Sequence, residues 1–506
     1  MSKSVILKGT LILAIFYVVS KFLSFVVEVL IATNLGACNE TDIYYLIDSI
    51  INSILPMLTV GIWKVFLPEY KGLVVQNKKN DAARLTYSLL IVFTFLSLLI
   101  SLSLFFFPNF FVSIYAPGFN LSMREQTASL VRIISPVFVF ATLSTFPTAI
   151  FQSKSNFVKS QAKEILYFLF PIVVLLVFST DVTVDVLIYS VLLAYVAACI
   201  MQFSLLDCRN TIKFDIKVLN KNTLSILRLF PVASLNSIIL QLNNVIDKIF
   251  SSTLVVGSIT CLNYGSKVIH LFDGLFSTAV SVAVFPRLTE LYSTGDKLKL
   301  NSFFYKYIVC IGFILFPISL LLLLFANDIV TLLFGYGKFS VESIQTTSLV
   351  LQMYALGFVA MGLTTIFNDI FFIMKKLEVL LYTTMLNICC NVLFDLLFVD
   401  EYGVPGLCLA TTISLYITLI IKWCLLSKHI KMDIYILYNF IHILISLLIS
   451  FILYKYILSC FFVSYNLIFR LLFESLSIIL IYIFSLASLN KTCRCIILGF
   501  LWKKKK

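Results

Sequence analysis

The sequence predicts an all-α polytopic membrane protein with about 14 transmembrane helices, arranged as two parallel six-helix lobes followed by two C-terminal helices. Three observations predict this fold class. Hydrophobic residues make up 60% of the 506 residues, charged residues make up 12%, and the mean hydropathy is +1.02, which is not the balance of a soluble domain. Apolar stretches of about 20 residues, the length that crosses a bilayer, recur along the whole chain. The two halves of the chain also resemble each other.

The predicted helices follow one another in order, with approximate centres at residues 20, 52, 97, 138, 168, 195, 237, 273, 313, 358, 386, 415, 445 and 478. The first stretch is interrupted by Lys21 and Glu28 and is not followed by a small-residue cleavage site. It is therefore a retained helix rather than a cleaved signal peptide. The second contains Pro56 and Gly61 and is expected to bend or break there. The remaining stretches stay apolar between polar loops.

Basic residues gather in alternate loops. Examples are Lys71 to Arg84, Lys154 to Lys163, Arg209 to Arg228, and the tail "LWKKKK". The intervening loops, such as "GACNETD", "STDVTVD" and "VDEYGVPG", are neutral or acidic. This alternation is the positive-inside rule, and it predicts that both termini are cytoplasmic. It also explains the net charge of +13 without a nucleic-acid partner.

An internal repeat divides the chain. Residues 138–145 read "FVFATLST" and residues 358–365 read "FVAMGLTT", and Glu28 has a counterpart at nearly the same offset in Asp247. The repeat predicts an N-terminal lobe over 1–215, a second lobe over 216–432, and two extra helices with a basic cytoplasmic tail over 433–506. Two parallel lobes that enclose a cavity are typical of transporters.

Charged residues lie inside the predicted helices, where lipid contact is unfavourable. Lys21 and Glu28 are two helical turns apart and share a face. Two interpretations are open: the charges pair to fix helix packing, or Lys21 and Lys267 bind an anionic headgroup such as phosphate. Lys64 has the further alternative of reaching the inner interface. The candidate substrate-binding residues are Lys21, Glu28, Asp42, Asp48, Lys64, Lys267 and His270.

A second set of polar residues is rich in oxygen. Asn391 and Asp395 are separated by one helical turn, Thr411 lies in the next predicted helix, and Asp247 lies in the seventh. Carboxylate, amide and hydroxyl oxygens suit a hard cation. The alternative is that Asp395 simply faces water near the outer end of its helix.

No enzyme signature of the GxxxxGK[ST], HExxH or GxSxG type is present. The sequence therefore predicts a transporter that is not an enzyme and uses no nucleotide. Its energy would come from an ion gradient, the membrane potential or the gradient of the substrate.

Three stretches carry a family resemblance. They are "SKFLSFVVEVLIATNLGACNETDIYYLIDSI" with "FLPEY" following, "NNVIDKIFSSTLVVGSITCLNYGSKVIHLFDGLFSTAVSVAVFPRLTELYSTGD", and "LLFGYGKFSVESIQTTSLVLQMYALGFVAMGL" followed by "YGVPGLCLATTIS". Together they resemble the MurJ/MviN lipid II flippases over most of residues 10–425. The resemblance implies the fold of the multidrug/oligosaccharidyl-lipid/polysaccharide exporters. It also implies movement of an undecaprenyl-pyrophosphate-linked saccharide from the inner to the outer leaflet of the bacterial cytoplasmic membrane.

The resemblance also suggests roles for individual residues. Lys21 and Lys267 stand where the family has cavity arginines, and Glu28 and Asp42 match acidic positions. A sodium site of some members maps onto side chains of this chain and one backbone carbonyl, with sodium as a coupling or structural ion and no tightly bound cofactor. The implied partners are the lipid-linked substrate and the bilayer, and the oligomeric state stays open, with a monomer among the options. The implied sodium ligands are Asp247, Asn391, Asp395, Thr411 and the carbonyl of Leu407.

This chain departs from the family pattern at several positions. Val27 and, in an ungapped register, Leu55 replace arginines, and Ser266 and His270 replace acidic residues. The cavity is thus less positive than a typical one. A lipid II flippase and a flippase for lipid-linked capsule or O-antigen units both fit. A cation-coupled multidrug exporter of the same fold is a more distant alternative, because two lysines would repel cationic drugs.

Overall fold

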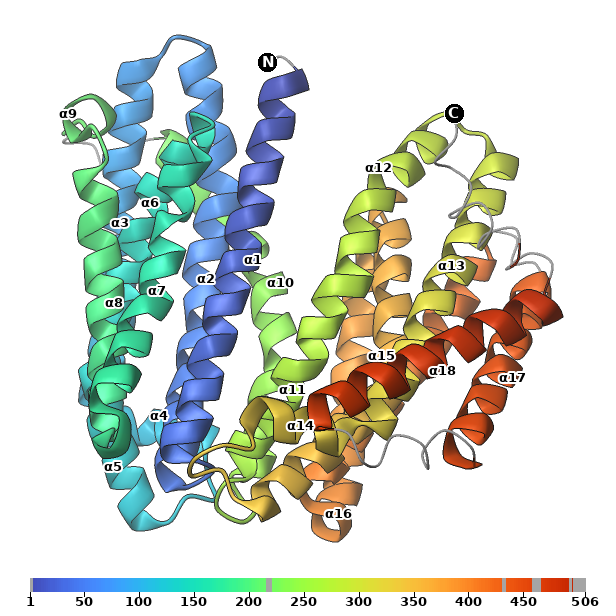
Figure 1. The fold of residues 1–506 in the computed structure, drawn as a ribbon. Coiled ribbons are helices and arrows are strands. Elements are labelled where there is room, and N and C mark those ends of the chain that lie inside the picture. The colour runs from blue at the N-terminus through green and yellow to red at the C-terminus, as the bar shows by residue number, and fades with distance from the viewer. Residues whose placement is uncertain (1–2, 215–220, 430–433, 457–465, 491–493, 495–506) are drawn as a thin grey trace. The chain divides into compact units, whose positions relative to one another are not determined.

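The computed structural model describes residues 3–214, 221–429, 434–456, 466–490 and 494, and every regular element in them is a helix (Figure 1). This confirms the predicted all-α membrane fold. Twelve helical segments among these residues are long and apolar enough to cross a membrane. One of them, Leu377–Ser427, contains two predicted helices, and the predicted helix centred at 237 lies in a further helix outside the twelve. All the predicted centres therefore lie within helices.

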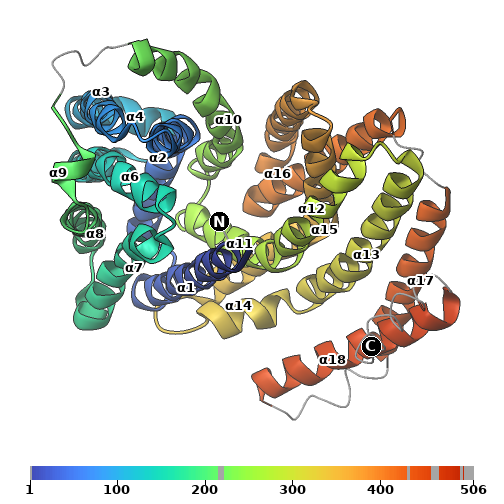
Figure 2. The same ribbon diagram turned by 90° about the horizontal axis from the view of Figure 1, so that it is seen from above.

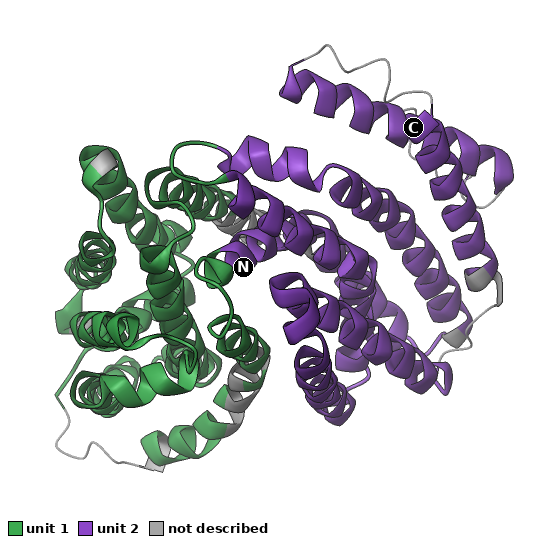
Figure 3. Cartoon of the chain, turned by 90° about the horizontal axis from the view of Figure 1, so that it is seen from below, with its two compact units in different colours: residues 1–260, 336–340 green, residues 261–335, 341–506 purple. Residues whose placement is uncertain are grey.

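The chain divides into two compact units (Figure 3). Unit 1 comprises residues 1–260 and 336–340, and unit 2 comprises residues 261–335 and 341–506. The lobe boundaries expected from the repeat at 215 and 432 stay a prediction, because the units follow packing rather than internal repetition.

Unit 1 is a helical bundle in which α2, α3 and α8 appear end-on when viewed from above (Figure 2). Its core contains four phenylalanine rings from four helices: the Phe66 and Phe146 centroids lie 5.2 Å apart, and those of Phe93 and Phe230 lie 4.8 Å apart. Such edge-on aromatic pairs stabilise a packed core beyond the area they bury. The helices are α1 (Lys3–Leu35), α2 (Asn39–Val75), α3 (Lys79–Phe106), α4 (Pro108–Tyr115), α5 (Leu121–Ile134), α6 (Val137–Ser153), α7 (Phe157–Phe178), η1 (Ser179–Asp181), α8 (Val184–Ser204), α9 (Cys208–Thr211) and α10 (Lys221–Ser251).

Unit 2 contains the helices from α11 onward, although α11 begins at the last residues of unit 1. A small core of Val309, Ile443, Tyr482 and Leu486 joins α13 to the two C-terminal helices α17 and α18. The helices are α11 (Ser258–Asp273), η2 (Gly274–Thr278), α12 (Ala279–Ser293), α13 (Lys297–Leu324), α14 (Ala326–Phe334), α15 (Val341–Ile373), α16 (Leu377–Ser427), α17 (Ile434–Tyr456) and α18 (Leu467–Leu489).

The expected break in the second helix is not present. α2 is one continuous helix from Asn39 to Val75, with Pro56 inside it. Gly61 has a packing role: a Cβ there would lie 2.2 Å from the Phe230 ring and 2.6 Å from Ser234 Oγ, both on α10. Glycine at this position therefore allows α2 and α10 to approach closely.

α16 is interrupted instead. Gly403 adopts φ 58° and ψ −137°, a conformation that glycine tolerates and other residues avoid. The kink separates the two predicted helices centred at 386 and 415. It folds one half of α16 back beside the other, so that Asn391 and Thr411 meet by a hydrogen bond between their side chains.

Candidate functional site

The seven predicted substrate-binding residues are divided between the units. Three helices carry them, with Lys21 and Glu28 on α1, Asp42, Asp48 and Lys64 on α2, and Lys267 and His270 on α11. Lys21, Lys64 and His270 are exposed, Lys267 and Asp48 are half-buried, and Glu28 and Asp42 are buried. Lys21 and Lys267 thus belong to different units, and each keeps some contact with the surface.

Glu28 is held by a neighbouring helix. The Tyr45 hydroxyl on α2 donates to Glu28 Oε2 at 2.5 Å. The backbone carbonyl of Tyr45 in turn accepts a hydrogen bond from Lys248 Nζ of α10 at 2.8 Å. Glu28 therefore takes part in helix packing within unit 1 through the hydroxyl of a neutral tyrosine.

Asp42 holds the start of α11. Its Oδ2 accepts from the Gly257 amide at 2.6 Å, and its Oδ1 accepts from the Thr260 amide at 2.9 Å and the Thr260 hydroxyl at 2.6 Å. A carboxylate at a helix N-terminus satisfies amides that have no partner within the helix and interacts favourably with the helix dipole. Asp42 is 3% exposed, so these bonds are made inside unit 1.

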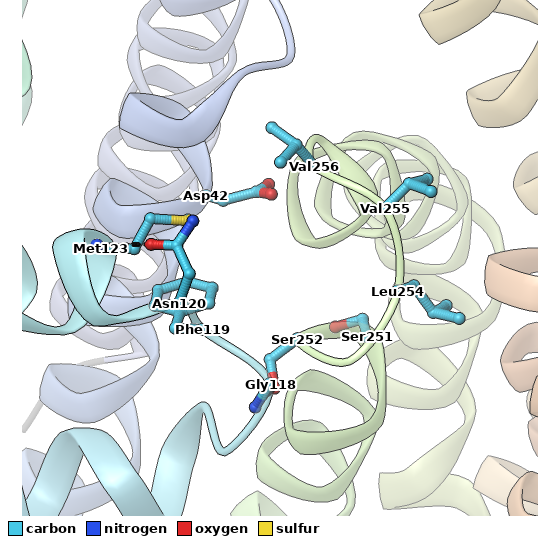
Figure 4. Close-up of a pocket in the computed structure, with 10 residues that line it drawn as sticks. All are labelled: Asp42, Gly118, Phe119, Asn120, Met123, Ser251, Ser252, Leu254, Val255 and Val256. Carbon is cyan, nitrogen blue, oxygen red and sulfur yellow. Dashed lines mark hydrogen bonds between the residues drawn. The ribbon is translucent and has the colours of Figure 1, made fainter.

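A cavity of about 390 Å³ lies beside Asp42 (Figure 4). Its walls come from the start of α2, the α4–α5 connection and the segment that follows α10. Asn120 caps α5 by accepting a hydrogen bond from the Met123 amide at 2.8 Å. The lining residues are Asp42, Gly118, Phe119, Asn120, Met123, Ser251, Ser252, Leu254, Val255 and Val256.

Four of the five predicted cation ligands gather in unit 2, across the kink of α16. Asn391 Nδ2 lies 3.3 Å from both Asp395 Oδ1 and Thr411 Oγ1. The Thr411 hydroxyl donates to the carbonyl of Leu407 at 3.1 Å. Asn391, Asp395 and Leu407 are fully buried. The fifth predicted ligand, Asp247, is 7% exposed and lies on α10 in unit 1.

The chemistry of the four ligands suits a hard monovalent cation. Asp395 Oδ2 and Asn391 Oδ1 are buried and accept no hydrogen bond from the residues described in the structure. Buried oxygens without a donor are unfavourable unless a cation or water satisfies them. No cluster of three His, Cys, Asp or Glu side chains occurs among the residues that the structure describes.

The positions that depart from the resembling family occupy distinct environments. Val27 is 5% exposed and lies within the core of unit 1, whereas Leu55 is half-buried on α2. The Ser266 hydroxyl donates to the carbonyl of Asn263 within α11 at 2.8 Å. An apolar core residue, Val27, therefore stands where the resemblance implies an arginine.

Sequence reasoning missed the polar neighbours of the cation ligands. Asn387 Nδ2 donates to the hydroxyls of Ser414 and Thr418 at 3.3 and 3.2 Å, and Lys422 Nζ donates to Asn368 Oδ1 at 2.8 Å. Part of the signal was present, because Asn387, Ser414, Thr418 and Lys422 recur at helical spacing on the two halves of α16, whereas Asn368 lies on α15. It was hidden because Ser and Thr in an apolar helix commonly bond to their own backbone.

Comparison with known proteins gives a consistent result. A family model described as "Lipid II flippase MurJ" matches residues 31–482. The "Probable lipid II flippase MurJ" of Buchnera aphidicola subsp. Acyrthosiphon pisum is 27% identical over 444 residues, which cover 84% of this chain and 83% of the relative.

Solved structures agree on the fold. One titled "Lipid II flippase MurJ, inward closed conformation" matches with a TM-score of 0.80 and 21% identity, covering 97% of this chain and 99% of that chain. A multidrug resistance MATE family transporter in an inward-facing conformation matches with a TM-score of 0.63 and 16% identity, covering 80% and 93%.

Proposed function

The chain belongs to the lipid II flippase MurJ family, and from this premise we propose that it moves lipid II across a membrane as a transporter rather than an enzyme. The observation that carries the proposal is the family match over residues 31–482. The helices long enough to span a membrane agree with it, because a lipid-linked substrate is taken up from and returned to the bilayer. The likeness to the MATE transporter extends to the fold alone.

Substrate recognition is proposed to depend on Lys21 and Lys267. Both side chains are cationic and incompletely buried, and each belongs to a different unit. A lysine ammonium binds phosphate oxygens as a point charge. Each lysine is proposed to contact the pyrophosphate of the substrate, and transport is proposed to proceed by alternating access. Asp42 and Glu28 support this site through the packing of α11 and α2, rather than by direct contact with the substrate.

The proposed location is the bacterial cytoplasmic membrane with both termini in the cytoplasm. The alternation of basic and neutral loops supports this orientation. It places the loops before α2 and before α8 outside, and it places the start and the end of α16 on the cytoplasmic side. Asp42 and its cavity then lie near the outer surface.

Sodium is proposed as the coupling ion. Asn391, Asp395, Thr411 and the carbonyl of Leu407 would hold it, and two of their buried oxygens have no other partner among the described residues. The ion supplies a positive charge that favours one form of unit 2 over another. Asp247 stays a predicted fifth ligand.

The test is complementation of a bacterial strain depleted of its own lipid II flippase. Expression of this chain should restore growth and the appearance of lipid II in the outer leaflet. A parallel strain that lacks a capsule or O-antigen flippase is the matched arm. Rescue of the second strain alone would reject lipid II as the substrate and favour the capsule or O-antigen alternative. That alternative is retained because Val27, an apolar residue, stands where the resemblance implies an arginine.

A further inference from the structure

A column of buried polar side chains runs between the two halves of α16, all of it within unit 2. Its first members, Asn391 and Asp395, belong to the candidate cation site. One helical turn along α16, Asn387 bridges the hydroxyls of Ser414 and Thr418. Ser414 is 0% exposed and Thr418 is 1% exposed, so these groups hydrogen-bond to each other rather than to solvent. The column thus extends from the cation ligands toward the C-terminal end of α16.

Lys422 ends this column. It is 3% exposed, and its Nζ donates to the side-chain oxygen of Asn368 on α15 at 2.8 Å. Thr411, Thr418 and Lys422 follow one another at intervals that keep them on one face of the second half of α16. An amide partner offers a hydrogen bond but no neutralising charge. Lys422 therefore places a positive charge at the end of the column opposite Asp395.

The nearest acidic group along α15 is engaged elsewhere. Asp369 follows Asn368 directly, and its Oδ2 accepts a hydrogen bond from the Ser281 hydroxyl of α12 at 2.5 Å. Among the residues that the structure describes, no carboxylate lies within ion-pair distance of Lys422. A buried ammonium without a carboxylate is unfavourable inside a membrane-spanning helix and is therefore a candidate for a functional role.

We propose that the positive charge of Lys422 repels the cation bound at the candidate cation site. This repulsion lowers the sodium affinity of the site, so that bound sodium is released in each transport cycle. The proposal rests on the sodium site described under the proposed function. An ion that drives transport must bind strongly enough to enter its site and weakly enough to leave it. A fixed charge at a distance achieves this without disturbing the ligands themselves.

The size of the effect follows from the helix. Thr411 and Lys422 lie about 16 Å apart along the axis, at a rise of about 1.5 Å per residue. At an effective dielectric constant of about 20, a unit charge at that distance changes the affinity for a monovalent cation about fivefold. The effect is small enough to permit binding and large enough to measure.

The experiment is a sodium titration of the purified full-length protein at constant ionic strength, with the melting temperature as readout. Lys422→Met removes the charge and keeps an apolar chain of similar length. It should lower the sodium concentration at half-maximal stabilisation about fivefold. Lys422→Arg keeps the charge and should leave that concentration unchanged. The matched control is Lys428→Met, because Lys428 lies just beyond the same helix and is exposed to screening by salt.

Each outcome bears on the proposal. The proposal is overturned if the sodium concentration at half-maximal stabilisation is unchanged in Lys422→Met. It is also overturned if that concentration changes equally in Lys428→Met. If Lys422→Met does not fold, Lys422→Gln gives the same test, because its amide still hydrogen-bonds to Asn368. A wild-type protein that responds equally to sodium and potassium overturns both the sodium site and the role of Lys422. Lipid II flipping by that same protein would leave the proposed function intact.

Discussion

Asp42 shows how one side chain can satisfy two expectations. The resemblance assigned it to an acidic position of the transport cavity, and the structure places its two oxygens against the start of α11. Both statements hold if Asp42 fixes the helix that carries Lys267 and His270. Its role is then to position the helix that carries Lys267 rather than to bind the substrate. The distinction is experimentally accessible, because a positioning residue affects stability and a pure ligand does not.

We predict that Asp42→Ala lowers the free energy of unfolding by about 3 kcal/mol, because two amides and a hydroxyl lose their acceptor in a buried site. Glu69→Ala is the matched control, because Glu69 is an exposed carboxylate on the same helix. Its effect should stay within about 0.5 kcal/mol. Thermal unfolding in detergent measures both. Equal stability of Asp42→Ala and the wild type would show that Asp42 does not hold α11.

Lys21 and Lys267 are each predicted to bind the pyrophosphate of the substrate. The double variant Lys21→Glu, Lys267→Glu should lose lipid II flipping by at least about tenfold, because two carboxylates would repel the pyrophosphate that two ammonium groups attract. Lys71→Glu is the control, since Lys71 is an exposed lysine near the end of α2 and lies outside the predicted site. Flipping is measured in proteoliposomes at matched protein amounts. Undiminished transport by the double variant would exclude these lysines as the pyrophosphate site.

At the scale of elements, α2 and α10 are joined by close packing at Gly61, and the expected bend in α2 stays a prediction. Pro56 and Gly61 together suggested a weak point, yet α2 continues through both. Gly61 faces the Phe230 ring and Ser234 of α10, and the Ser234 hydroxyl donates to the carbonyl of Met57 at 2.8 Å. The interruption occurs at Gly403 in α16 instead, where the backbone leaves the helical region.

This packing gives a matched pair of substitutions on one helix. Gly61→Ala should lower the free energy of unfolding by about 1–3 kcal/mol, because the new methyl group must displace the Phe230 ring. Gly72→Ala should be neutral or raise it by up to about 1 kcal/mol, since nothing lies within 4 Å of the added Cβ and alanine favours the helix. Thermal unfolding of the two variants measures both changes in stability. Similar melting temperatures for both would argue against close contact at Gly61.

At the scale of the molecule, the sequence predicted the helices better than their contacts. Hydropathy located each of the twelve apolar spans in the described part of the chain, because the bilayer imposes length and apolarity on each helix separately. Periodicity placed Asn391 and Asp395 on one face for the same local reason. The bonds from Asp42 to Gly257 and Thr260 join residues far apart in the chain. The packing of Gly61 against Phe230 also joins residues far apart in the chain. Neither contact produces a recognisable pattern within one stretch of sequence. The roles of single residues depended on such distant partners and could not be read from spacing.

Sodium is predicted to bind the folded protein and to stabilise it. A ligand that binds only the folded state raises the free energy of unfolding by about 2.7 kcal/mol at a hundredfold excess over its Kd. Sodium should therefore raise the melting temperature in a saturable manner, and potassium at equal ionic strength should not. Asp395→Ala should abolish the rise, because it removes the buried carboxylate that Asn391 contacts at 3.3 Å. Asp400→Ala, an exposed carboxylate on the same helix, should leave the rise intact. A sodium response that persists in Asp395→Ala would place the ion elsewhere. In the wild-type protein, buried water rather than sodium would then hydrogen-bond to Asn391 Oδ1 and Asp395 Oδ2.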